Sequence, residues 1–395
     1  MKFDYKKRKE RIMKKILLLL VAISLVTVFS LAGCKEAVSE DTGEVVEEES
    51  ATEEEASEEG ATEDMGTVVM ISKVYAHPWY QIAYKGAEEA CAEYGFTLET
   101  DGPSSASDIQ VQVDQVNNAI DRKPAGVLLA AIDPASLTDA LNKAGETSIP
   151  VICFDAGVPG NENVIATIAT DNVQAGALAA DELFKDADFQ EAVLKGTEDN
   201  PVVIGALAED GTSGSLVDRM DGFVFQLAEN LETLDGMEDA VEVTGETQWA
   251  KESEKPAKVN IITAVPPTAT AADSQAAVSA ILQKTNLVAI YVCSTTVNTG
   301  LLTSTSDGLE LDREDGEYKD LYAVAFDAGK ATKEAVRDRK FFGAVTQDPY
   351  FIGYNAVKML YDYLNGETPE DNYQDARWYN ADNMDDEEIA RLLYD

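Results

Sequence analysis

Short apolar runs alternate with amphipathic segments over most of the chain, from residue 67 onward. The runs are largely apolar on both faces and are bounded by Gly, Pro or polar residues, which is typical of buried parallel strands. The segments between them carry apolar residues at helical spacing, as at Ile109, Val113, Val116 and Ile120. We expect strands at residues 67–74, 126–132, 150–155, 202–207, 288–293, 321–327 and 343–347.

Strand–helix alternation predicts βαβ units, in which helices cover a parallel sheet. About 330 residues follow this pattern, which is more than a single hydrophobic core normally supports. The sequence therefore predicts an α/β fold with two Rossmann-like lobes, each built on a parallel sheet.

The N-terminal 66 residues differ from this pattern and divide into two pieces. Residues 1–33 carry eight basic and two acidic residues and end in an apolar stretch, which is typical of a secretory signal. The stretch closes with Leu31-Ala32-Gly33-Cys34, which resembles a bacterial lipobox, where the peptide is cut before a lipid-modified cysteine. We expect residues 1–33 to be a lipoprotein signal peptide and Cys34 to be lipidated; the alternative is an uncleaved membrane anchor over residues 16–33.

Residues 34–66 contain one basic and fourteen acidic residues and few large apolar ones. Self-repulsion keeps such a segment extended, so we expect a disordered acidic tether. The whole chain has a formal net charge of −42, which argues against nucleic-acid binding. With one histidine and four cysteines, we expect no metal site, no cofactor and no catalytic residues.

Ligands of doubly wound sheets bind at the carboxyl ends of the strands. The residues that follow the predicted strands, or begin the next helix, are aromatic or planar and polar. Such groups suit a small polyhydroxylated ligand, because rings cover C–H faces and the polar groups take hydroxyls in pairs. The candidate ligand-binding residues are His77, Trp79, Tyr80, Asp155, Arg219, Ser294, Asp327 and Gln347.

These residues stand in segments that resemble a known family. The segments are 68–72 with Ala76-His77-Pro78-Trp79-Tyr80, the strand 150–155 ending in aspartate, 169–172, 211–213 with Arg219-Met220-Asp221-Gly222-Phe223, 325–327 and 346–349. In this order they resemble type I periplasmic binding proteins of the ribose/galactose class, the substrate-binding components of sugar ABC importers.

The resemblance implies two lobes joined by a three-strand hinge, with lobe 1 formed by residues 67–170 plus 348–375 and lobe 2 by 171–347 plus 376–395. It also implies a monomeric, non-enzymatic, extracytoplasmic protein, lipid-anchored to the outer face of the bacterial cytoplasmic membrane, that delivers a sugar-like ligand to an ABC permease. In that family Trp79 and Tyr80 would stack on the sugar ring, and Asp155 and Asp327 would accept from hydroxyls. Arg219 would donate, and Gln347 would close the site near the hinge.

The chain also departs from the ribose-binding pattern. Ala156-Gly157, Ser294-Thr295 and His77 replace polar contacts of the ribose binders, which argues against ribose as the ligand. Residues 231–270 exceed the usual length, and 241–249 with 259–264 are predicted to form an added hairpin. Whether Trp249 lines the cleft is left open by the sequence.

Structural alternatives exist for the candidate residues. His77 can be a surface loop residue, and Trp79 and Tyr80 can be core residues that cap the first helix. Asp155 and Asp327 can be helix N-caps, and Arg219 can be an exposed helix residue. We expect the cysteines at 91, 153 and 293 to pack as small apolar residues, and Trp378 to pack against the C-terminal segment.

Three other functions compete with sugar binding for import. Asp155 with Asp327 can in principle form a glycosidase pair, although no phosphate loop or nucleophile elbow accompanies them. A sugar-responsive transcription regulator is argued against by the acidic N-terminal region. A ligand-capturing sensor, for autoinducer-2 or sugar chemoreception, stays open.

Overall fold

The computed structural model describes residues 64–394. The predicted signal peptide, the lipobox with Cys34 and all but the last three residues of the predicted tether lie outside the described residues. None of the helices between residues 64 and 394 has the length and apolar content needed to cross a membrane.

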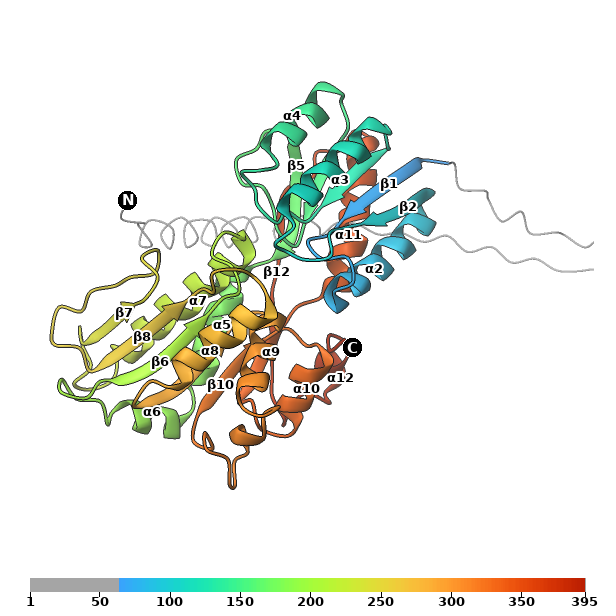
Figure 1. Ribbon diagram of the computed structural model, residues 1–395. Coiled ribbons are helices and arrows are strands. Elements are labelled where there is room, and N and C mark those ends of the chain that lie inside the picture. Colours follow the sequence, from blue (N-terminus) through green and yellow to red (C-terminus); the bar gives the residue numbers. More distant parts are fainter. Residues whose placement is uncertain (1–63, 395) are drawn as a thin grey trace, which may run out of the picture. The chain divides into compact units, whose positions relative to one another are not determined.

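Two sheets, each covered by helices, make up the described part of the chain (Figure 1). The first sheet has the order β12-β5-β4-β3-β1-β2, and every pair of neighbours in it is parallel. We call this sheet and its helices the first lobe. Its strands are β1 (Gly66–Ile71), β2 (Phe96–Asp101), β3 (Gly126–Leu129), β4 (Val151–Phe154), β5 (Val164–Thr170) and β12 (Asn372–Gln374).

The second sheet has the order β13-β11-β10-β9-β6-β8-β7 and belongs to the second lobe. Only β13, which pairs with β11, is antiparallel to its neighbour in this sheet. The predicted α/β fold with two mainly parallel sheets is therefore confirmed. The strands are β6 (Val202–Leu207), β7 (Val241–Thr244), β8 (Val259–Ala264), β9 (Leu287–Val292), β10 (Tyr322–Phe326), β11 (Gly343–Thr346) and β13 (Arg377–Tyr379).

The helices begin where the local sequence favours it. Proline occupies the first turn of α2 and of α11, where the missing N–H costs nothing, and Asp171 caps α5 by accepting from Gln174 N at 3.1 Å. The helices are α2 (Pro78–Tyr94), α3 (Ile109–Asp121), α4 (Thr138–Glu146), α5 (Asn172–Phe184), α6 (Ala187–Val193), α7 (Gly214–Leu231), α8 (Ala271–Leu282), α9 (Thr295–Ser304), α10 (Lys330–Arg337), α11 (Pro349–Leu364) and α12 (Glu387–Ala390), with a 3₁₀ turn at Leu309–Leu311.

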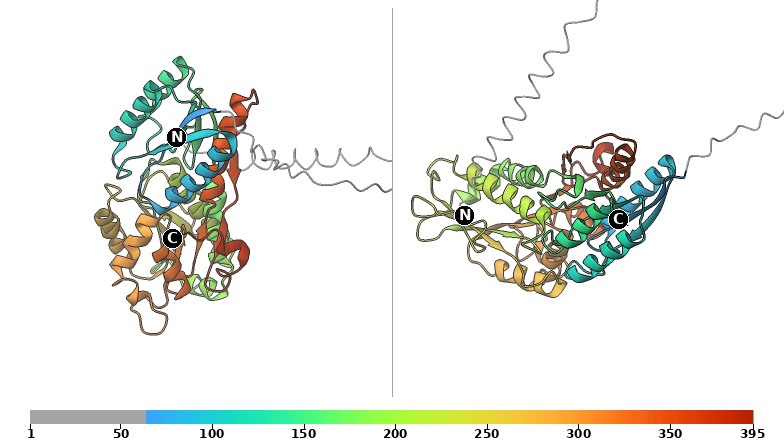
Figure 2. Two further views of the ribbon diagram at one scale, coloured as in Figure 1. Left: turned by 90° about the vertical axis from the view of Figure 1, so that its right-hand side faces the viewer. Right: turned by 90° about the horizontal axis from the view of Figure 1, so that it is seen from above.

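The chain passes between the two sheets at three places: after β5, between β11 and α11, and between β12 and β13. Helix α11 therefore packs in the first lobe against α2, far from it in sequence, as both views in Figure 2 and the colours of Figure 1 show. The two helices lie so close together that a Cβ at Gly353 would be 1.9 Å from the Ala83 carbonyl oxygen. Only glycine therefore fits at this position.

Two strand predictions need correction. Strands β2, β5, β12 and β13 were not predicted, and β7 and β8 do not form a hairpin. They pair in parallel, with β8 inserted between β6 and β7, so they extend the second sheet at its edge. A parallel pair needs a crossover, and residues 245–258 supply it.

Candidate ligand-binding site

A cavity lies at the carboxyl ends of the strands of both lobes. It encloses about 610 Å³ of space that no protein atom fills, part of it open to solvent. All eight sequence-predicted residues line it: His77, Trp79, Tyr80, Asp155, Arg219, Ser294, Asp327 and Gln347.

Asp155 is the centre of the first lobe's contribution. It directly follows β4, is 6% exposed and has a φ of +59°, a left-handed conformation that aspartate adopts more readily than most residues. The Tyr80 hydroxyl donates to its Oδ2 at 2.6 Å, and Lys73 Nζ lies 3.2 Å from the same oxygen. Burial and the Asp155 carboxylate raise the pKa of Tyr80 well above its usual value, so this hydroxyl stays a donor.

Asp327 is the matching carboxylate of the second lobe. It directly follows β10, is 5% exposed and has a φ of +72°. Gln347 Nε2 donates to its Oδ1 at 2.6 Å, and Thr295 Oγ1 donates to its Oδ2 at 3.4 Å. Arg219 Nη1 lies 3.9 Å from Oδ2. One carboxylate thus faces the cavity between an amide, a hydroxyl and a guanidinium.

Arg219 is held by its surroundings rather than by solvent. It is 4% exposed, its Nε donates to Asn172 Oδ1 at 2.9 Å, and its Nη1 donates to the Cys293 carbonyl at 3.0 Å. Its guanidinium carbon lies 3.8 Å from the ring centroid of Phe326, a favourable cation–π geometry. Burial alone would lower its pKa, but Asp327 and other acidic groups outweigh this and raise it. The alternative of an exposed helix arginine is wrong.

The N-cap alternative for the two aspartates is also wrong. The helix after Asp155 is capped by Asp171, and the N-cap position of α10 is Gly329 rather than Asp327. Among the candidate residues, His77 caps a helix: its Nδ1 accepts from Trp79 N at 3.2 Å while the ring lines the cavity.

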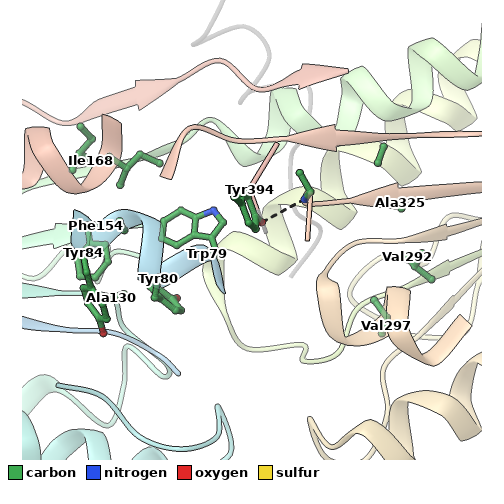
Figure 3. Close-up of a cluster of buried hydrophobic side chains, with 14 of the residues drawn as sticks. Trp79, Tyr80, Tyr84, Ala130, Phe154, Ile168, Val292, Val297, Ala325 and Tyr394 are labelled. Carbon is green, nitrogen blue, oxygen red and sulfur yellow. Dashed lines mark hydrogen bonds between the residues drawn. The ribbon is translucent and has the colours of Figure 1, made fainter. Parts of the chain in front are cut away.

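The aromatic wall comes from the start of α2. Trp79 is 3% and Tyr80 5% exposed, and their rings meet edge to face with centroids 5.0 Å apart. Figure 3 shows Trp79 between first-lobe side chains such as Phe154 and the second-lobe Tyr394, all members of one hydrophobic cluster. The indole Nε1 has no hydrogen-bond partner among the described residues. A buried donor without a partner is costly, so this N–H is available to a ligand.

Gln347 connects the cavity to the segments that cross between the lobes. While its Nε2 donates to Asp327, its Oε1 accepts from Thr170 Oγ1 at 2.7 Å. Thr170 is the last residue of β5, and Gln347 stands directly before Asp348, the N-cap of α11. The amide therefore joins two of the three crossings.

Sequence reasoning missed several lining residues. Lys73 of the first lobe donates to Ser213 Oγ at 3.2 Å and to Ser215 Oγ at 3.1 Å in the second lobe, so it bridges the cavity. Glu209 accepts from Ser294 Oγ at 3.0 Å. Lys73 and Glu209 each follow a strand within two residues, which is the signal that could have found them; the remaining polar lining residues are Asp210, Thr295 and Thr296.

Other candidates lie away from the cavity. Trp249 is fully buried in the core of the second lobe, and its Nε1 donates to Asp221 Oδ1 at 2.9 Å. Trp378 packs against Phe342 beside β11. The buried thiols of Cys91 and Cys153 have pKa values raised to about 12 by burial, as expected of packed side chains. Residues 64–394 contain no cluster of three His, Cys, Asp or Glu side chains placed to hold a metal ion.

The fold and the cavity define a two-lobed α/β binding protein, with a polar and aromatic cavity between the lobes. The chain belongs to the family of the periplasmic binding protein domain, whose family model matches residues 68–368. The predicted membership in the type I periplasmic binding proteins is confirmed.

Curated relatives share parts of the chain. A multiple sugar-binding periplasmic protein, SbpA of Azospirillum brasilense, is 34% identical over 80 residues, which are 20% of this chain and 22% of that protein. The fructose import binding protein FruE of Bifidobacterium longum is 26% identical over 133 residues, 32% of this chain and 40% of that protein. The matches thus span less than half the length of these relatives.

Solved structures match over most of the chain. A protein from Brachyspira murdochii, named as an ABC transporter, LacI family transcriptional regulator, is 29% identical with a TM-score of 0.68, covering 83% of this chain and 98% of that one. An ABC transporter solute-binding protein from Agrobacterium vitis with bound D-fucose is 24% identical with a TM-score of 0.67, covering 83% of this chain and all of the other, and supports the fold alone.

Proposed function

We propose that the protein is the solute-binding component of a sugar ABC importer and binds a sugar or sugar-like polyol in the cavity between its lobes. The observation that carries this is the composition of the cavity. Two buried carboxylates, Asp155 and Asp327, face it from opposite lobes, each beside cationic or amide donors, next to the aromatic pair Trp79 and Tyr80. Vicinal hydroxyls are bound by paired planar groups of this kind.

In this proposal the carboxylates accept from ligand hydroxyls, Arg219 donates, and the Trp79 and Tyr80 rings cover the C–H face of the sugar. His77 and Ser294 complete the rim, and Gln347 links the ligand site to the hinge. The names of the relatives, which are sugar-binding and fructose import proteins, support a sugar as the ligand class.

Closure of the lobes follows from the same arrangement. A ligand that contacts residues of both lobes binds the closed form better than the open one, and so shifts the equilibrium toward it. We assign lobe 1 to residues 67–170 plus 348–375 and lobe 2 to 171–347 plus 376–395; the division of the strands between two sheets supports this assignment.

The proposal includes the location. The signal peptide over 1–33, lipidation at Cys34 and the acidic tether would hold a monomer at the outer face of the cytoplasmic membrane, where an ABC permease receives the ligand. The support is the sequence pattern of residues 1–66 and the family of the folded part. In this role the protein performs no chemistry on its ligand.

A ligand screen tests the function. Thermal melting of the purified protein is measured with D-galactose, D-fucose, D-arabinose, D-tagatose, D-fructose, D-glucose, polyols and autoinducer-2. At a concentration 100-fold above Kd, a ligand that binds only the folded state adds about 2.7 kcal/mol, which raises Tm by about 4 °C or more.

Each outcome of the screen has a meaning. Binding of a sugar without its conversion supports the proposal, whereas binding of autoinducer-2 alone favours the sensor. Hydrolysis of an aryl glycoside would contradict a pure binding role.

A further inference from the structure

A second cavity adjoins the first. The two share four lining residues, Ala106 and Ile132 of the first lobe with Glu209 and Asp210 of the second. The second cavity encloses about 1160 Å³ that no protein atom fills, part of it open to solvent. The cleft is therefore one continuous space that extends beyond the residues around Asp155 and Asp327.

One wall of the second cavity is built by residues of the segment 231–270, which the sequence predicts to exceed the family's usual length. Glu246, Thr247 and Gln248 line it directly after the added edge strand β7, opposite Ser107 and Ile109 at the start of α3. The loop that follows β8, with Pro266 and Pro267, forms the third side. Hydroxyl, carboxamide and carboxylate groups thus line the second cavity together with apolar side chains.

The turn that carries Thr247 and Gln248 is pinned at both ends. Val243 and Lys251 exchange backbone hydrogen bonds at 2.8 and 3.1 Å, and Glu246 N donates to Thr263 Oγ1 at 2.9 Å. Trp249 anchors the turn in the lobe core.

The pinned turn presents polar groups to the cavity. Thr247 and Gln248 are exposed, and their side chains make no hydrogen bond within the described part of the chain. A preorganised turn with free polar groups facing a cavity is what a ligand contact needs.

The charge of the second cavity limits what it accepts. Glu209, Asp210 and Glu246 line it, and no lysine or arginine is among its described lining residues. A phosphate or carboxylate on the ligand would be repelled there. Neutral hydroxyls, in contrast, find acceptors in the carboxylates and donors in the threonines and Gln248.

We propose that the second cavity is a subsite for a second sugar ring, so that the ligand is a neutral disaccharide or a longer glycoside whose first ring lies in the cavity between Asp155 and Asp327. This inference rests on the proposed sugar-binding function and narrows its ligand class. The second ring would lie between the Thr247–Gln248 turn and the start of α3.

Calorimetric titration of the full-length protein tests the inference with lactose, melibiose, maltose, sucrose and xylobiose, each against its constituent monosaccharides. Two or three added neutral hydrogen bonds predict about 10- to 100-fold tighter binding of at least one disaccharide than of either of its monosaccharides. A disaccharide with a uronic acid as its second ring should bind no more tightly than the monosaccharide of its first ring.

Two variants test whether the tighter binding of the disaccharide comes from the second cavity. Thr247→Trp fills the second cavity and should remove the disaccharide advantage while monosaccharide affinity stays within about twofold of wild type. Gln248→Ala should weaken the disaccharide about three- to tenfold, the loss of one hydrogen bond, and the matched control Gln283→Ala, an exposed glutamine at the end of α8, should change nothing.

The possible failures are distinguishable. If monosaccharides bind and no disaccharide binds more tightly, the subsite is refuted while the proposed function stands. The subsite is likewise refuted if Thr247→Trp leaves disaccharide affinity unchanged. If no sugar of either set binds, the proposed function fails, and the subsite fails with it.

Discussion

Replacing Asp327 with asparagine removes one negative charge from the cavity and little else. Asparagine is nearly isosteric and tolerates the left-handed conformation that this position requires, at a φ of +72°. The amide oxygen can still accept from Gln347 Nε2. The amide NH₂, however, replaces the carboxylate oxygen that lies 3.9 Å from Arg219 Nη1.

The expected loss in affinity follows from the change in hydrogen-bond type. A bond to a charged acceptor contributes about 1.5–3 kcal/mol, and a neutral one about 0.5–1.5 kcal/mol. If Asp327 accepts from two ligand hydroxyls, the loss is about 2–3 kcal/mol, or about 30- to 150-fold in Kd.

The ligand-free protein should also lose stability. The buried Arg219 loses its nearest carboxylate, but it keeps its bonds to Asn172 and to the Cys293 carbonyl. We therefore expect the free energy of unfolding to fall by about 2 kcal/mol, somewhat less than the roughly 3–5 kcal/mol of a fully broken buried pair, and Tm to fall by about 3 °C.

Calorimetric titration with the sugar found in the screen measures the first effect, and thermal melting without ligand measures the second. Asp338→Asn is the matched control, because Asp338 is exposed at the end of α10 and pairs with Lys340 across 3.4 Å at the surface. An affinity within about twofold of wild type would refute the role of Asp327 in binding. A lowered Tm with unchanged affinity would mean that the carboxylate serves Arg219 alone.

Three further changes probe other parts of the protein. Trp79→Phe removes part of the ring surface and the indole N–H, which lacks a partner among the described residues, so calorimetry should show about tenfold weaker binding of the ligand. Equal affinity would mean that this ring is purely structural. Lys73→Met removes the cation that links the first lobe to Ser213 and Ser215 of the second. Small-angle scattering of the ligand-free protein should then show a larger radius of gyration, and an identical profile would contradict the bridge. Cys34→Ala should leave the protein in the medium or as unprocessed precursor on cell fractionation, whereas normal processing and membrane retention would rule out the lipobox.

The buried parallel strands were predictable because their composition alone distinguishes them. The run at 202–207 matches β6 at both ends, since Pro201 precedes it and the polar Glu209 follows within two residues. Strand β2 escaped because it lies at a sheet edge, where its residues are largely partly or fully exposed and an apolar run is not required. Strand β5 is rich in valine, isoleucine and threonine, which favour strands, so its composition could have predicted it.

The pairing of β7 with β8 shows a different limit. Both strands carry a clear period-2 pattern, with buried and partly buried residues in alternation. That pattern is the same for parallel and antiparallel neighbours, and a connection of this length permits either. The direction depends on β8 pairing with β6 in the interior of the sheet, a contact that no local pattern encodes.

The candidate site was predictable to the extent that it follows strand ends. Asp155 and Asp327 each stand directly after a strand, and the fold brings both to one cavity. The bridge from Lys73 to Ser213 and Ser215 was not predictable, because it depends on how closely two lobes with separate sheets approach each other.

The three crossings also govern the order in which the chain can fold. Helix α11, which covers β3, β4 and β5 of the first lobe, is synthesised only after all strands of the second lobe except β13. Neither lobe can bury its complete core on the nascent chain, because each still lacks an element from beyond residue 348. Contacts so distant in sequence slow folding. Neither lobe, and therefore not the cavity between them, can be completed until the residues beyond 348 have been made.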